Sequence, residues 1–175
     1  MRNIYILMLI LVLLTGCQKV PEIPPTPMKE TDVLDYGVFA NLIEPNSTKI
    51  TVANTYYPIE GIFNNTPEEG FYLNETIPAL IYNGSKPQYF VVHWNAEFCA
   101  SNNNVVATIG LKYNGVLCSR GLMSQFLKFA GECVHNSGAN VRYLEKGDSV
   151  QLVTSADIAT TLTFEQFTTT INKLY

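Results

Sequence analysis

The strict alternation of apolar and polar residues over Gln88–Ala100 constrains the fold of this chain more than any other stretch. Its large apolar side chains share one face of an extended segment: Phe90, Val92, Trp94, Ala96 and Phe98. The opposite face carries His93, Asn95 and Glu97. A period of two residues is the pattern of a β-strand with one buried face. The stretch therefore predicts a long strand that buries Trp94 and Phe98 in a core.

The residues that follow predict that the chain turns back along this strand. Ser101-Asn102-Asn103-Asn104 is a polar turn, and Val105–Tyr113 repeats the alternation. Asn114-Gly115 comes next, a dipeptide that tolerates the positive φ angles of a type I′ hairpin. Val116–Cys118 continues beyond it, so an antiparallel meander is expected.

Short stretches rich in β-branched and aromatic residues alternate with Asn, Gly, Pro and Ser clusters elsewhere in the chain. Leu122–Ala130 fits a helical face about as well as a strand, and its neighbours favour a strand. Phe71–Tyr82 is left open because Pro78 cannot donate to a ladder. The other strands are expected at Tyr36–Leu42, Lys49–Thr55, Pro58–Phe63, Ala139–Leu144, Ser149–Ser155, Ile158–Phe164 and Phe167–Leu174. Roughly eight to ten strands without a long helix predict an all-β fold, a two-sheet antiparallel jelly-roll sandwich.

The N-terminus is typical of an export signal. Arg2 precedes an apolar run, Ile4–Leu14, which is shorter than the about 20 residues that span a membrane. The run ends in Leu14-Thr15-Gly16-Cys17, an order that resembles the bacterial lipobox. The resemblance implies removal of residues 1–16 and attachment of lipid to Cys17, which would anchor the exported chain to the cell envelope. Because Gln18 follows, it also implies the outer membrane in a Gram-negative host; the alternative is an ordinary signal peptide.

Composition divides the mature chain into a linker and one domain. Residues 17–35 are proline-rich, with Pro21, Pro24, Pro25 and Pro27 favouring an extended stalk. Residues 36–175 are expected to form the jelly-roll domain, since a full chain of 175 residues with 47% hydrophobic and 15% charged residues suits one compact core. Loss of Arg2 with the signal changes the net charge from −4 to −5, because −4 − 1 = −5. An acidic chain without a basic stripe argues against nucleic acid as a partner.

Three cysteines remain if Cys17 is lipidated: Cys99, Cys118 and Cys133. In an oxidising compartment an odd number predicts one disulfide and one free thiol. Cys118 and Cys133 flank one connection and are the preferred pair. The alternative is that all of these thiols are free.

The sequence contains none of the common catalytic or metal motifs. His93 and His135 belong to no Gly-x-Ser-x-Gly or His-Glu-x-x-His pattern. Cys133-Val134-His135 has no second ligand pair at zinc spacing, and turn chemistry explains Asp148 beside Gly147. We therefore expect no enzyme, no cofactor and no metal.

Recognition is expected in the loops, because β scaffolds commonly present binding residues there. The candidate loops are Asn64–Gly70, Asn83–Gln88 and Asn102–Asn104. Their candidate binding residues are Asn64, Asn65, Glu68, Glu69, Lys86, Asn102, Asn103 and Asn104.

The mature domain resembles the jelly-roll heads of the tumour-necrosis-factor and complement-head type, especially those of bacteriophage structural proteins. The resemblance lies in KITVANTYYPIEG, YFVVHWNAEFCASNNNVVATIGLKYNGV, VRYLEKGDSVQLVTS and TLTFEQFTTTINKL. Its most diagnostic parts are the hairpin at Asn114-Gly115 and the turn Leu144-x-x-Gly147-Asp148-x-Val150. The resemblance implies a homotrimer that packs through aromatic-rich sheet faces.

Together these features predict a membrane-anchored surface lipoprotein with a non-catalytic jelly-roll head that binds an envelope protein or glycan. A phage or prophage origin would make it a device for receptor occlusion or attachment. The alternatives are a structural component of a phage virion or envelope assembly, and a carbohydrate-active enzyme of sandwich fold.

Overall fold

The computed structural model describes residues 39–42, 44–61, 63–66, 70–74 and 79–174. The predicted signal peptide, Cys17, the linker, Glu68, Glu69 and Pro78 lie outside these residues. The secondary structure elements within these residues are all strands, and these residues include no helix that could cross a membrane.

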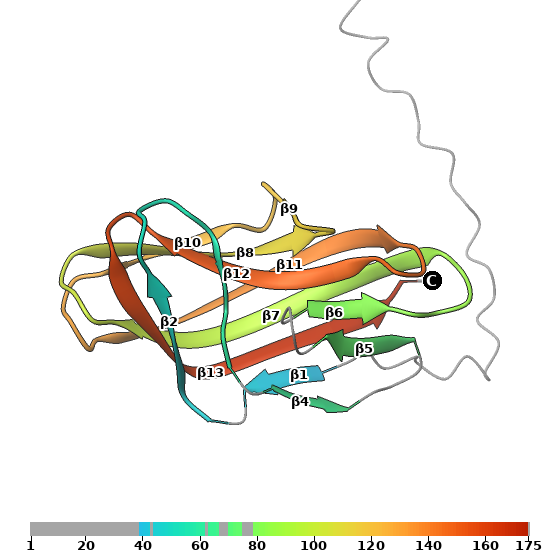
Figure 1. Ribbon diagram of the computed structural model, residues 1–175, viewed down its shortest axis with the longest axis horizontal. Coiled ribbons are helices and arrows are strands. Elements are labelled where there is room, and N and C mark those ends of the chain that lie inside the picture. Colours follow the sequence, from blue (N-terminus) through green and yellow to red (C-terminus); the bar gives the residue numbers. More distant parts are fainter. Residues whose placement is uncertain (1–38, 43, 62, 67–69, 75–78, 175) are drawn as a thin grey trace, which may run out of the picture. The chain divides into compact units, whose positions relative to one another are not determined.

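The strands follow one another along the chain with mostly short connections (Figure 1). Their bounds are β1 Phe39–Leu42, β2 Asn46–Ile50, β3 Tyr57–Pro58, β4 Phe63–Thr66, β5 Phe71–Asn74, β6 Ala79–Tyr82, β7 Gln88–Ala100, β8 Val105–Tyr113, β9 Val116–Leu117, β10 Met123–Leu127, β11 Cys133–Leu144, β12 Ser149–Ala156 and β13 Thr160–Lys173.

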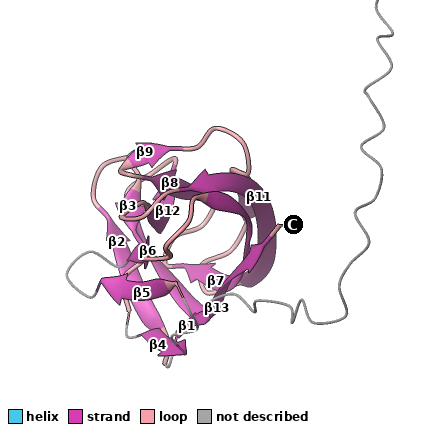
Figure 2. Cartoon of the chain, turned by 90° about the vertical axis from the view of Figure 1, so that its right-hand side faces the viewer, coloured by secondary structure: helices cyan, strands magenta, loops and turns pink. Residues whose placement is uncertain are grey.

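The strands form two antiparallel sheets, and the predicted all-β jelly-roll sandwich is confirmed. One sheet has the order β4-β1-β13-β7-β11, with β2 also paired to β13. The other has the order β5-β6-β12-β8-β10, with β3 beside β12 and β9 beside β8. Figure 2 views the chain nearly along the long strands, so that the sheets are seen from their ends. Apart from the consecutive pairs β5–β6 and β8–β9, neighbouring strands in each sheet are not consecutive in the sequence, as in a jelly roll.

The core lies between the sheets and is centred on β7. The predicted bounds of β7 are confirmed, and its apolar face is buried, with Trp94 at 2% and Phe98 at 0% exposure. Val105, Ala107, Ile109 and Leu111 of β8 face it from the second sheet and are also buried. The alternation seen in the sequence is thus the alternation between core and surface.

Two predicted turns have the expected geometry. Asn114 and Gly115 have φ angles of 50° and 79°, as a type I′ turn requires. Gly147 has a φ of 97°, and the Asp148 carboxylate accepts a hydrogen bond from the Glu145 amide at 2.8 Å. Asp148 therefore acts in turn formation, as predicted.

The C-terminal strand corrects one prediction. Ile158–Phe164 and Phe167–Leu174 were expected as separate strands, but β13 runs through both and pairs with β7 over most of its length. A register shift between Phe164 and Gln166 marks a β-bulge. The bulge moves the buried positions by one residue, so Phe164 and Phe167 are both buried. In the sequence this change of phase looks like a break.

Strand β11 begins at Cys133, six residues before the predicted start at Ala139. Asn136, Ser137 and Gly138 resemble a turn, yet all pair with β7. Gly138 lies opposite Trp94, and a Cβ atom built there would be 2.6 Å from the indole ring. The glycine makes room for tryptophan rather than for a turn.

The predicted strands before residue 71 need further correction. β2 ends at Ile50 rather than Thr55, because the chain turns at Asn54, where φ is 59°. The Tyr57 hydroxyl holds that turn by accepting a hydrogen bond from the Val52 amide at 3.0 Å.

Two further elements in this region were also predicted incorrectly. Of the strand expected at Pro58–Phe63, Pro58 ends β3 and Phe63 begins β4, while residues 59–61 lie outside any strand. The expected loop residues Asn64 and Asn65 lie in β4, which pairs with β1. In the stretch Phe71–Tyr82, which the sequence left open, the described residues 71–74 and 79–82 form the paired strands β5 and β6.

Candidate binding surfaces

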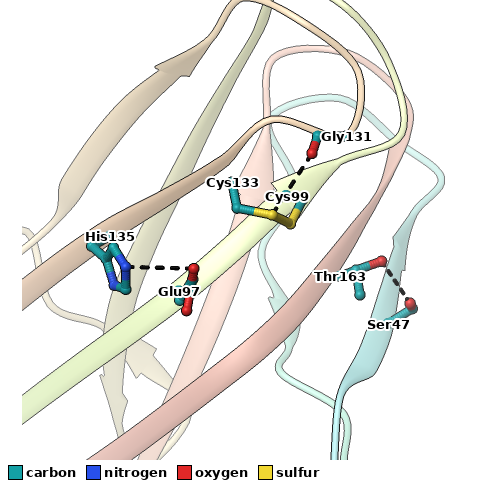
Figure 3. The surroundings of a disulfide bond; sticks show 7 residues. All are labelled: Ser47, Glu97, Cys99, Gly131, Cys133, His135 and Thr163. Carbon is teal, nitrogen blue, oxygen red and sulfur yellow. Dashed lines mark hydrogen bonds and ion pairs between the residues drawn. A yellow bond between two sulfur atoms is a disulfide. The ribbon is translucent and has the colours of Figure 1, made fainter.

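The disulfide joins Cys99 to Cys133, so the predicted Cys118–Cys133 pair is wrong (Figure 3). Cys99 on β7 lies directly opposite Cys133 on β11, with their Cα atoms 4.2 Å apart. This is close to the separation of a non-hydrogen-bonded antiparallel pair. The register of β7 and β11 sets this pairing. It can be predicted from the sequence only if β11 is known to start at Cys133. Cys118 is buried as a free thiol.

The same two strands present an outward surface, which we call the outer β7 face. It consists of the outward residues of β7 with their partners on β11: Tyr89 with Tyr143, Val91 with Val141, His93 with Ala139, Asn95 with Ser137, and Glu97 with His135. Its imidazole and carboxyl groups are those of His93, His135 and Glu97, and the His135 Nε2 and Glu97 Oε1 atoms lie 3.4 Å apart. An exposed pair of this kind contributes little stability. His93 is exposed on this face, as predicted.

A shallow groove of about 500 Å³ crosses the middle of the outer β7 face. Ser137, Gly138 and Ala139 line it from β11, while Thr168 and Thr170 line it from β13. Small side chains leave the strands uncovered there. Among the residues that line the groove, His93 carries the one imidazole, and none is Asp, Glu, Lys or Arg.

One end of the outer β7 face is apolar and exposed. The Tyr89 and Tyr143 rings lie 4.9 Å apart, with 56% and 48% exposure. Val141 beside them is 50% exposed, and the Leu174 amide bonds the Tyr89 carbonyl. Grouped exposed apolar side chains are typical of an interaction surface. We call Tyr89, Val141 and Tyr143 the aromatic end.

The asparagines of the predicted loop Asn102–Asn104 support the structure locally. Asn102 Oδ1 accepts a hydrogen bond from Thr160 Oγ1 at 2.9 Å. Asn103 Oδ1 accepts one from the Ala130 amide at 2.7 Å. Asn104 has a φ of 56° and closes the turn. These contacts use both side-chain oxygens, and a binding role for the loop stays a prediction.

The other predicted binding residues are dispersed. Asn64 and Asn65 lie within β4, while Lys86 belongs to the connection between β6 and β7 and lines a separate pocket. The described members of the predicted set therefore lie on different elements rather than in one site.

A partly buried polar cluster under the aromatic end was not predicted. The Arg142 guanidinium lies over the Tyr113 ring at 4.5 Å, and its Nη2 donates to the Cys118 sulfur. Asn140 Nδ2 donates to the Arg120 carbonyl at 2.6 Å. The available signal was the inward phase of Asn140 and Arg142 on β11, which requires polar partners inside.

The chemistry of this cluster is that of a structural contact. Burial raises the pKa of Tyr113 to about 12, although the Arg142 charge acts in the opposite direction. The phenol therefore stays protonated at neutral pH. Tyr113, Cys118 and Arg142 line a pocket of about 290 Å³ together with Asp148. The Asp148 carboxylate oxygens accept hydrogen bonds from the Asn114 side chain and the Glu145 amide. Across the described residues, no three His, Cys, Asp or Glu side chains are grouped to hold a metal.

Solved structures share this fold at low sequence identity. The Eiger tumour necrosis factor of S. frugiperda superposes with a TM-score of 0.52 at 10% identity, covering 81% of this chain and 94% of that one. Murine APRIL at pH 5.0 also gives 0.52, at 12% identity and with 79% and 99% coverage. The globular domain of zebrafish complement 1qA gives 0.48 at 13% identity, with 79% and 95% coverage.

Comparisons with family models and with curated proteins find no match. The superpositions on the two tumour-necrosis-factor-type structures confirm the predicted resemblance in fold. The lipid anchor and the phage origin stay predictions.

Proposed function

We propose that this chain is a lipid-anchored envelope protein whose jelly-roll head binds other proteins without catalysis and associates with copies of itself. The observation that carries the proposal is the aromatic end of the outer β7 face. Tyr89, Val141 and Tyr143 are all about half exposed and adjacent in register. Exposed tyrosines supply large contact area at low conformational cost.

The rest of the outer β7 face supports docking of a protein surface. Among the ten residues that form it, Glu97 is the only Asp, Glu, Lys or Arg, and it lies 3.4 Å from His135. Charged residues are depleted from the centres of protein interfaces, where they would be desolvated. The groove beside His93 gives this otherwise flat surface a recess. In a trimer, which the resemblance implies, each of the three chains would bury this face against a neighbour.

Binding to a partner is tested by capture of envelope proteins, run beside a glycan array and a broad hydrolase screen. The test variant combines Tyr89→Ser with Tyr143→Ser. The matched control combines Tyr72→Ser with Phe126→Ser, since those aromatics are 48% and 56% exposed elsewhere. Reproducible partners should be lost from the test variant and kept by the control. Turnover of any substrate would contradict the non-catalytic proposal.

The anchor is tested separately with Cys17→Ala. Radioactive palmitate should label the parent chain and leave the variant unlabelled, because the cysteine thiol carries the first lipid. Equal labelling of both chains would contradict the lipoprotein proposal. Adjacent phage tail genes would instead favour a structural component of a virion.

A further inference from the structure

The dipeptide Asn114-Gly115 forms the turn between β8 and β9, and the Asn114 side chain is bonded at both of its polar atoms. Its Nδ2 donates to Asp148 Oδ1 at 2.8 Å, and its Oδ1 accepts from the Ser149 amide at 2.8 Å. The Asn114 amide also donates to the Ser149 carbonyl at 3.1 Å. These bonds join the β8–β9 turn to the turn that precedes β12, and we call this connection the clasp.

The Asp148 carboxylate is itself held in place for this contact. Its Oδ2 accepts from the Glu145 amide at 2.8 Å, and the Asp148 amide donates to the Glu145 carbonyl at 2.9 Å. The carboxylate therefore presents its Oδ1 to Asn114 in a fixed position. A hydrogen bond to a carboxylate is about twice as strong as one between neutral groups.

An asparagine followed by glycine can react with its own backbone, because glycine has no side chain that hinders its amide nitrogen. The Gly115 nitrogen attacks the Asn114 Cγ atom. An N–Cγ bond forms, the Cγ–Nδ2 bond breaks, and ammonia leaves with the Gly115 amide proton. Water then opens the cyclic imide at either of its two C–N bonds, which leaves an aspartate or an isoaspartate.

Both the turn and the clasp oppose this reaction. Ring closure needs the Asn114 Cβ and the Gly115 nitrogen on the same side of the Cα–C bond. The type I′ turn, with φ angles of 50° and 79°, holds them on different sides. The Asn114 side chain must also leave Asp148 and Ser149 before its Cγ can reach the nitrogen. Loss of two hydrogen bonds, one of them to a carboxylate, slows such a step roughly a hundredfold.

Conversion would prevent the clasp from forming again. A carboxylate in place of the Asn114 carboxamide has no N–H to donate, and it would meet the Asp148 carboxylate where the two side chains are now 2.8 Å apart. Like charges at this separation repel each other. Tyr143 of the aromatic end lines the same pocket as Asn114 and Asp148, so the change would occur beside that surface.

We propose that Asn114 is a one-way modification site that the clasp protects. While Asp148 holds the carboxamide, the residue stays asparagine. Once an open clasp has allowed conversion, repulsion between the two carboxylates keeps the clasp open. The proposal does not depend on the binding function proposed above.

The first test follows conversion by peptide mass spectrometry on the detergent-solubilised full chain at mildly alkaline pH. The folded parent should convert roughly a hundredfold more slowly than the same chain denatured in guanidinium chloride. Asp148→Ala should convert about tenfold faster than the folded parent, because the bond to the carboxylate is lost. Ser149→Ala is the matched control, since it keeps both the Asp148 carboxylate and the backbone bonds of the clasp, and it should convert at the parent's rate.

Asp148→Asn keeps an acceptor oxygen without the charge, so its rate should lie between those of the parent and Asp148→Ala. This variant carries the test if Asp148→Ala does not fold. A parent that converts as fast as the denatured chain would overturn the proposal. So would Asp148 variants that convert no faster than Ser149→Ala.

The second test imitates the product. Asn114→Asp should raise the hydrogen-exchange rates of the amides at residues 145–149 by at least about tenfold, because the clasp is open. The double variant Asn114→Asp, Asp148→Asn places one carboxamide and one carboxylate across the contact again, and its exchange should return to nearly the parent's rates. Unchanged exchange in Asn114→Asp, or equal exchange in the single and double variants, would overturn the one-way step.

Discussion

The two ends of the β7–β11 strand pair differ in how their side chains are used. At the Cys99–Cys133 end, a disulfide joins the strands and the adjacent turn is held by its own asparagines. At the aromatic end, Tyr89 and Tyr143 contact each other and remain about half exposed. At the Cys99–Cys133 end the polar side chains bond within the domain, whereas at the aromatic end apolar surface remains exposed. The proposed recognition surface therefore consists of exposed aromatic residues within strands, whereas the sequence had pointed to polar loop residues.

The largest expected effect is a loss of stability that would affect both ends of the strand pair. Phe98 lies on the buried face of β7 at 0% exposure, with its ring 5.7 Å from that of Phe164. Phe98→Ala should lower the free energy of unfolding by about 3–5 kcal/mol through lost burial and a cavity. Urea denaturation measures this, and a loss below about 1 kcal/mol would contradict the central position of β7 in the core.

The second prediction separates the two ends. Replacing Cys99 and Cys133 together by Ala should lower the free energy of unfolding by about 3–4 kcal/mol, because the bridge closes a loop with a sequence separation of 34. Hydrogen exchange should rise at residues 99–104 and 128–133 and remain nearly unchanged around Tyr89 and Tyr143. Equal loosening at both ends would mean that the disulfide governs the whole strand pair.

Features caused by neighbouring residues in the chain were predictable from the sequence, whereas features caused by residues on a distant strand were not. The pattern of Gln88–Ala100 predicted β7 with both of its bounds, because burial of one face is recorded in successive residues. Gly138 could not be interpreted in that way. Its cause is Trp94, which lies opposite on another strand and far away in sequence.

The candidate sites were less predictable than the fold for the same reason. Pairing of Cys99 with Cys133 depends on strand register, which three cysteines alone do not specify. Tyr89 and Tyr143 form a patch only after β7 and β11 are aligned. Lys86 was predicted as a loop residue, but its pocket also depends on Tyr82 and on Lys173, which is near in space and distant in sequence.

The third prediction tests the middle of the strand pair. Gly138→Ala places a methyl group against the Trp94 indole at a distance that requires the ring or the strand to shift. The expected loss is about 1–3 kcal/mol in unfolding free energy, as for other overpacked cores. Gly115→Ala is not a suitable control because of its φ of 79°, so Ala139→Ser, on the outward side, serves instead. Equal stability of Gly138→Ala and Ala139→Ser would contradict the role assigned to Gly138.

The smallest expected effect concerns Tyr113 beneath the aromatic end. Because burial raises its pKa from 10.0 to about 12, the folded chain retains the phenolic proton where the unfolded chain loses it. This contribution to stability is complete below about pH 10 and is lost as the pH rises toward 12. Between pH 9 and pH 11, Tyr113→Phe should lose less stability than the parent, whereas Tyr72→Phe should behave like the parent. Identical pH profiles for all three chains would contradict a buried, protonated Tyr113.

Light scattering on residues 36–175 tests most directly whether the aromatic end is a docking surface. At tens of micromolar, the parent and the Tyr72→Ser, Phe126→Ser control should both have the mass of an oligomer. The Tyr89→Ser, Tyr143→Ser variant should have the mass of one chain, with an unfolding free energy within about 0.5 kcal/mol of the parent at a concentration where both are monomeric. A parent that is strictly monomeric, or a test variant that associates as well as the control, would contradict the account.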